Sequence, residues 1–353
     1  MGKLKAWFGI ILILAIGILI HFEFPFNDKG VVFKDEKFSE RIPSRAEAQN
    51  ALTTDTVDHF FEKISLVDIE LQMKRNLTSN VKENPKTVYQ NYLRNEIGNF
   101  SFFEKRTLKR IADDVFKKLE SKTSFGDPHN FQIVKITKNI YGENIFFTRN
   151  KTIFLTEDFF KLNEQQQAQT FAHELSHIFS RYLKGYKEKL YPTIGFRRWG
   201  VFSHFMKFNQ NKNLLNPDGV NSDWYFQFII FDNPEDSTFE KFEPLIVSKD
   251  TLKKRKNYFE NCEFRLLKIN RSNSNNLYEY SPQMTIDVYN NYFKENYGIT
   301  YTIHPDEIIA DLFAQWLIDE EKNLLGFENL RGLKNLKRQT FEAFKEVLRK
   351  QNK

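Results

Sequence analysis

The spacing of apolar residues divides the chain into helical and β-rich segments. Apolar residues recur at helical spacing over residues 60–67 and 108–119, which predicts two amphipathic helices before residue 122. Three short runs rich in β-branched and aromatic residues follow, and we expect strands at residues 131–136, 144–148 and 152–155. This order predicts three strands that lead directly into a helix.

That helix is predicted to begin at Asn163, an N-cap residue followed by Glu164 in the first turn, and to run to about residue 184. A second clear helix follows Pro305, and an amphipathic helix near residues 341–348 closes the chain. The pattern indicates an α+β protein with a mostly helical C-terminal lobe.

The pattern is weaker over residues 185–300, which we interpret as an insertion. A strand-like run at 224–231 and a helix around 286–295 are the elements expected there. No internal repeat is present.

The N-terminus carries an uncharged apolar run, residues 6–22 (AWFGIILILAIGILIHF), at the lower length limit for crossing a hydrocarbon core. Bulky residues follow the run, which favours an uncleaved signal anchor at residues 1–22 over the alternative, a cleaved signal peptide. Basic residues on both sides leave the orientation open. The short basic start favours export, so we expect a membrane-anchored, extracytoplasmic protein of a bacterial envelope.

Residues 23–50 are charged and lack periodicity, which is typical of a linker, and residues 51–353 are expected to form the folded domain. A length of 353 residues allows one two-lobed domain or two smaller ones. The net charge of +6 arises from interleaved signs, so a nucleic-acid partner is not expected. The single cysteine, Cys262, excludes an intrachain disulfide and a cysteine-based metal cluster.

The sequence His173-Glu174-Leu175-Ser176-His177 lies within the helix predicted from Asn163 and matches the HExxH motif. Two imidazoles at positions i and i+4 lie one turn apart on one helix face, where both can bind one Zn²⁺ ion. Glu174 lies between them, at the position of a residue that deprotonates a metal-bound water.

A catalytic zinc ion needs a third protein ligand and an open position. The metzincin pattern fails because residues 180 and 183 are Ser180 and Leu183 rather than Gly and His. Further along, Glu307 and Asp311 match an ExxAD motif after Pro305. Glu307 can complete a His₂Glu site, and Asp311 can accept the ring N–H of a ligating histidine. Should Glu307 only stabilise its helix, the third ligand would have to come from the 185–300 region, for example Glu188, Glu235 or Glu240.

HExxH followed by ExxAD resembles the gluzincin metallopeptidases. The stretches at 170–182, 190–196, 216–218 and 303–314 also resemble an uncharacterised group of bacterial proteins classed as zinc metallopeptidases. The resemblance implies a zincin-like fold, in which a small mixed sheet with an edge strand precedes the HExxH helix. It also implies His173, His177 and Glu307 as zinc ligands and Glu174 as the base. One departure is the 130-residue distance from His177 to Glu307, which is much longer than in thermolysin-like enzymes.

Further contacts with a substrate are less sharply defined by the sequence. Residues 148–155 precede the metal helix, in the position of an edge strand that pairs with an extended peptide. Arg149, Tyr301 and His304 are candidates for contacting the substrate or polarising a scissile carbonyl, and a structural role is the alternative for each.

Taken together, the sequence predicts a zinc-dependent peptidase in which Glu174 activates a zinc-bound water to hydrolyse a peptide or protein substrate. The alternative is a catalytically silent zincin-fold envelope protein that binds a partner or acts as a scaffold. The intact Glu174 favours the enzyme, because a retired enzyme has no chemical reason to keep a residue that is not a ligand.

Overall fold

The computed structural model describes residues 36–77, 83–123, 125, 130–198, 213–220, 223–233, 236–249, 257–269, 278–279, 285–325 and 333–349. The chain divides into two compact units, Met1–Glu40 and Arg41–Lys353. The described part of the first unit contains the short helix α2 (Glu36–Ser39). Within the described residues, no helix combines the length and apolar character needed to cross a membrane. The anchor predicted at residues 6–22 lies outside the described residues.

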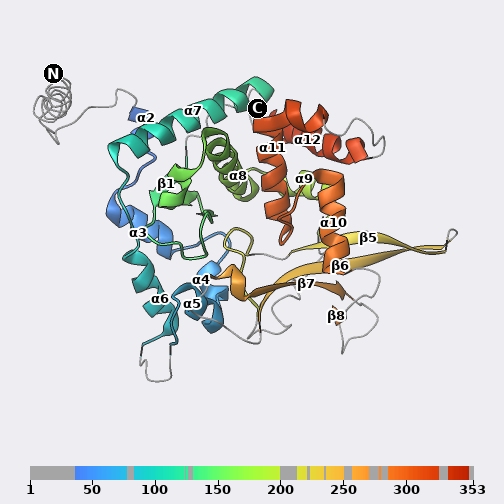
Figure 1. Ribbon diagram of the computed structural model, residues 1–353, viewed down its shortest axis with the longest axis horizontal. Helices are drawn as coiled ribbons and strands as arrows, with labels where there is room; N and C mark the ends of the chain where they lie inside the picture. Colours follow the sequence, from blue (N-terminus) through green and yellow to red (C-terminus); the bar gives the residue numbers. More distant parts are fainter. Residues whose placement is uncertain are drawn as a thin grey trace, which may run out of the picture. The chain divides into compact units, whose positions relative to one another are not determined.

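The second unit contains both helices and sheets, which confirms the predicted α+β class (Figure 1). Its described α-helices are α3 (Arg45–Thr53), α4 (Phe60–Lys63), α5 (Leu66–Gln72), α6 (Pro85–Arg94), α7 (Phe102–Thr123), α8 (Glu164–Tyr182), α9 (Tyr186–Leu190), α10 (Ile286–Tyr297), α11 (Pro305–Leu325) and α12 (Leu333–Arg349). Short 3₁₀ helices are η1 (Glu157–Lys161), η2 (Tyr191–Ile194) and η4 (Phe259–Asn261).

Two predicted boundaries near the start of this unit need correction. The linker predicted at residues 23–50 extends too far, because α3 begins at Arg45, where Ser44 and Glu47 form a capping box. The single helix expected at 60–67 is divided into α4 and α5. Ser65 causes the division, since its side chain accepts the N–H of Asp68 and caps α5.

A small mixed sheet precedes α8, with β1 (Gln132–Lys135), β2 (Phe147–Arg149) and β3 (Thr152–Leu155) in the order β1-β3-β2. Strand β1 is parallel to β3 and β2 is antiparallel to it. The strand that comes immediately before α8 in the sequence, β3, is therefore the central strand, and β1 and β2 are the edge strands. The edge predicted over residues 148–155 is corrected accordingly: the turn at Asn150 folds β2 back against one side of β3, and β1 covers the other.

Helix α8 begins as predicted, with the side chain of Asn163 accepting the N–H of Gln166 in a capping box. It contacts α7 on one side and α11 on the other, as Figure 1 shows. Aromatic rings fill both contacts, with Phe171 against Phe116 of α7 and Phe179 against Phe313 of α11. This packing fixes the HExxH helix against the helix that carries Glu307.

The region interpreted as an insertion contains a five-stranded antiparallel sheet in the order β4-β5-β6-β7-β8. Its strands are β4 (Phe196–Arg198), β5 (Trp224–Asn233), β6 (Asp236–Ser248), β7 (Cys262–Ile269) and β8 (Tyr278–Glu279). The sequence predicted only the strand at 224–231. Charged residues interrupt the apolar positions of β7 and of the first half of β6, which weakens the strand pattern in the sequence. The lobe after β3 is thus less helical than predicted.

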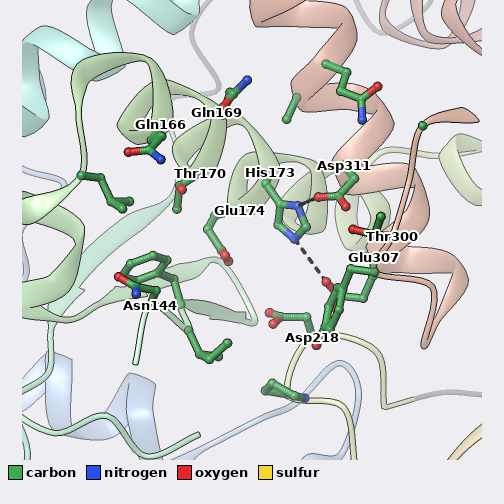
Figure 2. Close-up of a pocket in the computed structure, with 18 residues that line it drawn as sticks. Asn144, Gln166, Gln169, Thr170, His173, Glu174, Asp218, Thr300, Glu307 and Asp311 are labelled. Carbon is green, nitrogen blue, oxygen red and sulfur yellow. Dashed lines mark hydrogen bonds and ion pairs between the residues drawn. The ribbon is translucent and has the colours of Figure 1, made fainter. Parts of the chain in front are cut away.

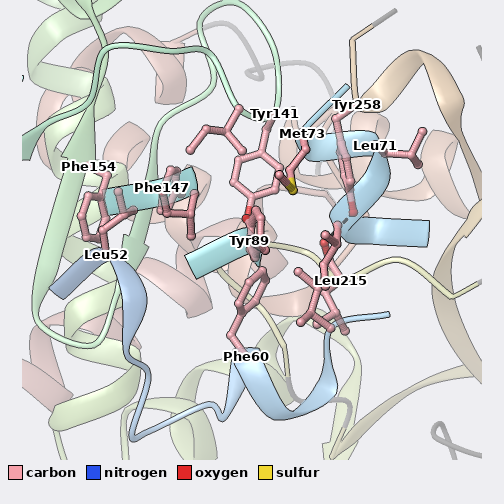
Figure 3. Packing of buried hydrophobic residues seen from close by; sticks show 14 of the residues in the cluster. Leu52, Phe60, Leu71, Met73, Tyr89, Tyr141, Phe147, Phe154, Leu215 and Tyr258 are labelled. Carbon is pink, nitrogen blue, oxygen red and sulfur yellow. Dashed lines mark hydrogen bonds between the residues drawn. The ribbon is translucent and has the colours of Figure 1, made fainter. Parts of the chain in front are cut away.

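The main hydrophobic core joins the first helices, the small sheet and the segment 213–220 (Figure 3). Its labelled members include Leu52, Phe60, Tyr89, Tyr141, Phe147, Phe154, Leu215 and Tyr258. Leu214 donates its N–H to the carbonyl of Ile246, which ties this segment to β6. Arg181 of α8 donates to the backbone carbonyl of Asp218. The segment 213–220 is thereby held between the second sheet and the HExxH helix.

Candidate metal centre

The two histidines of the motif project from the same face of α8. Their Nε2 atoms are 3.1 Å apart, as expected for residues one helical turn apart. The His177 side chain is fully buried, whereas 17% of the His173 side chain is exposed. One imidazole therefore lies in the interior and the other lines a cavity.

Glu307 meets the histidines from the first turn of α11. Its Oε2 atom is 3.2 Å from Nε2 of His173 and 3.7 Å from Nε2 of His177. Ligand atoms held at about 2.05 Å around a tetrahedral zinc ion stand about 3.4 Å apart. The two nitrogens and the oxygen therefore have the mutual spacing of metal ligands, and the structure brings together the three residues predicted from the sequence.

Two further side chains hold these groups in place. Asp311 lies one turn after Glu307, and its Oδ1 atom is 2.8 Å from Nδ1 of His173. This contact favours the tautomer with its proton on Nδ1, which leaves Nε2 of His173 free to coordinate. Asn216 donates a hydrogen bond of 2.6 Å from Nδ2 to Oε1 of Glu307. Nδ1 of His177 is buried and has no hydrogen-bond partner within the described part of the chain.

The buried charges of Glu307 and the two histidines stabilise one another. Burial opposes the charged form of Glu307, but His177 and His173 outweigh it and hold the pKa of this carboxyl well below its usual range. Burial likewise opposes the charged form of His173, yet Asp311 and Glu307 raise its pKa well above the usual value. Glu307 is thus an anion at neutral pH, as a metal ligand must be.

Glu174 lies beside this cluster and points into the cavity (Figure 2). The hydroxyl of Thr148 on the edge strand β2 donates a hydrogen bond of 2.7 Å to Oε2 of Glu174. Burial raises the pKa of Glu174, although His177 and His173 act in the opposite direction. A raised pKa makes the carboxylate a stronger base than an ordinary glutamate, which favours a role in proton transfer.

The cavity next to Glu174 has a volume of about 560 Å³. Its described lining residues come from the segment before β2, from α8, from the segment 213–220 and from the region around α11; they include Asn144, Ile145, Phe146, Gln166, Gln169, Thr170, Pro217, Asp218, Thr300 and Gln315. A volume of this size is typical of sites that bind small ligands or short peptide segments.

Arg149, predicted as a substrate contact, does not line this cavity. Its side chain is buried on the other face of β2, donates 2.8 Å to the carbonyl of Leu52, and lies 4.1 Å from the ring centre of Phe60. Successive residues of a strand point to opposite faces, so the inward position of Thr148 excludes Arg149 from the same side. Arg149 therefore has a structural role.

Tyr301 and His304 have different positions. Tyr301 lines the cavity, and burial raises the pKa of its hydroxyl well above the usual value. His304 does not line it: Nδ1 of His304 accepts the N–H of Asp306 and so caps the start of α11. A side chain at Gly219 would clash with the His304 ring, so glycine is required there. The structure thus places His304 at the start of α11 and not among the described residues that line this cavity.

Two of the three alternative third ligands lie away from the centre. Glu188 pairs with Arg198 and Glu240 pairs with Lys268, and neither glutamate lines the cavity. Glu235 is outside the described residues.

Sequence reasoning assigned no role to three residues of the site, Thr148, Asn216 and Asp218. Thr148 can be recognised as a residue of the site only when β2 is known to be an edge strand and it is known which of its side chains face α8. Asn216 and Asp218 contributed to the family resemblance, but nothing in the sequence linked them to residues 91 and 70 positions away.

Comparisons of this chain with protein-family models, with curated proteins and with solved structures found no match.

Proposed function

We propose that this protein is a zinc-dependent peptidase with a zincin-like fold, in which Glu174 is the general base. The observation that carries the proposal is the convergence of two histidine nitrogens and a Glu307 oxygen beside Glu174, at the wall of an open cavity. Histidine and carboxylate ligands in this combination are a donor set used for catalytic zinc.

His173, His177 and Glu307 would hold the ion. Zn²⁺ would supply Lewis acidity to the scissile carbonyl and lower the pKa of water within its reach. Asp311 keeps the His173 ring in the tautomer and orientation that binding needs. Asn216 fixes the carboxylate of Glu307 through the oxygen that does not face the histidines.

Glu174 would move the protons of the reaction. Its carboxylate takes a proton from the attacking water as the new oxygen–carbon bond forms. It delivers that proton to the amine nitrogen as the carbon–nitrogen bond breaks, so one water is consumed and one acid and one amine are released. The hydroxyl of Thr148 holds the carboxylate in place throughout.

The proposal includes tethering by residues 6–22 at a bacterial envelope, with a peptide or protein substrate met outside the cytoplasm. These residues lie outside the described part of the chain, so the tether depends on their sequence alone.

The test measures zinc content and cleavage of a peptide library. Both measurements are made on the purified full chain and on its Glu174→Gln variant. We expect about one zinc per chain in both proteins, with hydrolysis only in the unmodified one, because Glu174 handles protons and is not a ligand. Glu164→Gln makes the same chemical change at an exposed position of the same helix and should remain active. Zinc in both proteins with cleavage by neither would favour the silent binding protein, and full activity of Glu174→Gln would eliminate the mechanism.

A further inference from the structure

Four of the described residues that line the cavity are acidic. No lysine or arginine is found among the described lining residues. The proposed function assigns Glu307 to the metal, Asp311 to His173 and Glu174 to proton transfer. The fourth, Asp218, has no role in it.

Asp218 is a buried carboxyl group with one oxygen still available. Only 5% of the residue is exposed, and one oxygen accepts the backbone N–H of Thr148. No donor among the described residues reaches the other oxygen, and Arg181 donates to the backbone carbonyl of Asp218 rather than to its carboxylate. In Figure 2 the carboxylate is directed into the same space as Glu174. Burial opposes the charged form of Asp218 and raises its pKa, and His177 and Arg181 offset this cost only in part. A cationic group of the substrate placed at the open oxygen would therefore stabilise the carboxylate.

The bond from Thr148 to Asp218 also limits how a peptide can lie along the edge strand. Arg149 and Thr152 close a two-residue hairpin and form its hydrogen-bonded pair. In the next pair, Thr148 with Ile153, the backbone groups of each residue point away from the other strand. The N–H of Thr148 therefore faces the open side of β2, where Asp218 occupies it. A peptide that pairs with this edge cannot continue past Thr148.

The direction of the peptide follows from the charges. Residues 144–146, which lead into β2, line the cavity and leave room for a chain along them. An antiparallel peptide there has its N-terminus beside Asp218 and its later residues along 144–146. A parallel peptide would bring its C-terminal carboxylate against Asp218 and would be repelled.

We propose that the cavity binds the free N-terminus of a peptide, with Asp218 accepting hydrogen bonds from the α-ammonium group, so that the enzyme removes N-terminal residues. This inference rests on the proposed peptidase function. One ligand atom each of Glu174, His177 and Asp218 lies within 4.8 Å of the other two. The amine site and the catalytic carboxylate are therefore close together. The α-nitrogen of a peptide is only about 2.5 Å from the carbonyl carbon of its own residue, which fits such a short separation. An extended lysine side chain places its nitrogen about 7 Å from that carbon, which is too far.

Binding can be measured without turnover in the full-length Glu174→Gln protein loaded with zinc. Calorimetric titration would compare trialanine amide with its N-acetyl form. We expect the free amine to bind roughly 10- to 100-fold more tightly, as for a charge-assisted hydrogen bond. Equal affinities, or no binding of either probe, would overturn the inference without requiring any change at Asp218.

Asp218→Asn, added to the same protein, keeps an oxygen for the N–H of Thr148 but removes the charge. It should abolish the preference for the free amine and leave the affinity for the acetylated probe unchanged. Asp114→Asn is the matched control, because it makes the same change on the exposed face of α7 and should keep the preference. A preference that persists in Asp218→Asn would exclude Asp218 as the amine site.

Cleavage by the unmodified zinc-loaded protein separates this inference from the function on which it rests. Free decapeptides should lose their first residue, and Nα-acetylated copies should react about 100-fold more slowly. Internal cleavage of both series at similar rates, or cleavage of acetylated peptides beside an internal lysine, would overturn the inference and leave the peptidase function intact. Absence of cleavage in both series would overturn the peptidase function itself.

Discussion

A buried carboxyl group away from the metal centre leads to a quantitative prediction about stability. Asp68, on α5, is fully buried and accepts a hydrogen bond of 2.5 Å from the Tyr258 hydroxyl and one of 3.0 Å from the N–H of Leu215. Burial raises the pKa of Asp68 from an ordinary value of 3.8 to about 7, although both hydrogen bonds act in the opposite direction. Leu215 immediately precedes Asn216, so Asp68 also anchors the segment that holds Glu307.

The sign and size of the pH dependence follow from this shift. Below about pH 4, Asp68 is protonated in both the folded and the unfolded chain and contributes no penalty. As the pH rises from there to about 7, the unfolded chain releases the proton and the folded chain retains it, so the free energy of unfolding falls. Each tenfold change in the proton equilibrium is worth 1.36 kcal/mol, so the full loss is about 4 kcal/mol. This is a large share of the roughly 5–15 kcal/mol that stabilises a typical domain.

Urea unfolding of the full chain at intervals from pH 4 to pH 9 would measure this loss. Asp68→Asn removes the titrating group, and its free energy of unfolding should decline with pH by about 4 kcal/mol less than that of the unmodified protein. Other buried carboxyl groups titrate in both proteins, so the difference between the two curves isolates Asp68. Asp114→Asn, an exposed control, should follow the unmodified curve. Parallel curves for Asp68→Asn and the unmodified protein would refute a raised pKa at Asp68.

Four further predictions test the site and the tether. Glu307→Ala should lose most of its bound zinc, whereas Asp311→Asn should weaken zinc binding or activity only about 10- to 100-fold; equal zinc contents measured by atomic absorption would contradict the third-ligand assignment. Thr148→Val should keep zinc but lower kcat/KM about 10- to 100-fold, since it removes a hydrogen bond to a charged carboxylate, and an unchanged value would show that the bond is dispensable. Arg149→Met should lower the free energy of unfolding by about 2 kcal/mol with KM unchanged, and a raised KM would restore the substrate contact predicted from the sequence. Removal of residues 1–25 should release the protein from membranes in carbonate extraction, and a full chain that is itself extracted would argue against an anchor.

The helices and the proposed metal ligands were predictable because their signals are local. The capping of α8 by Asn163 and the spacing of His173 and His177 lie within one segment, where helical periodicity decides which side chains meet. Asp311 follows Glu307 by one turn for the same reason. The sequence therefore predicted each half of the centre, and α11 brings the halves together.

The sequence was less informative where the partner of a side chain depends on how the chain folds. Arg149 and His304 are charged or polar residues near the motifs, and proximity alone made them candidates for substrate contacts. Their actual partners depend on strand alternation and on the start of α11, since Arg149 faces Leu52 and His304 caps the helix through Asp306. A polar side chain close to a motif can thus satisfy the backbone instead of the substrate.

The long spacing between His177 and Glu307, which weakened the resemblance to thermolysin-like enzymes, has a structural explanation. The intervening chain forms the five-stranded sheet, and the segment 213–220 is bonded to strand β6 of that sheet. From this segment, Asn216 reaches Glu307 and Asp218 reaches Thr148 at the edge of the small sheet. The spacer therefore orders Glu307, the proposed third ligand, and contributes to one end of the cavity. These two contacts, and not the spacing as such, make this cavity suited to a chain end rather than to the middle of a peptide.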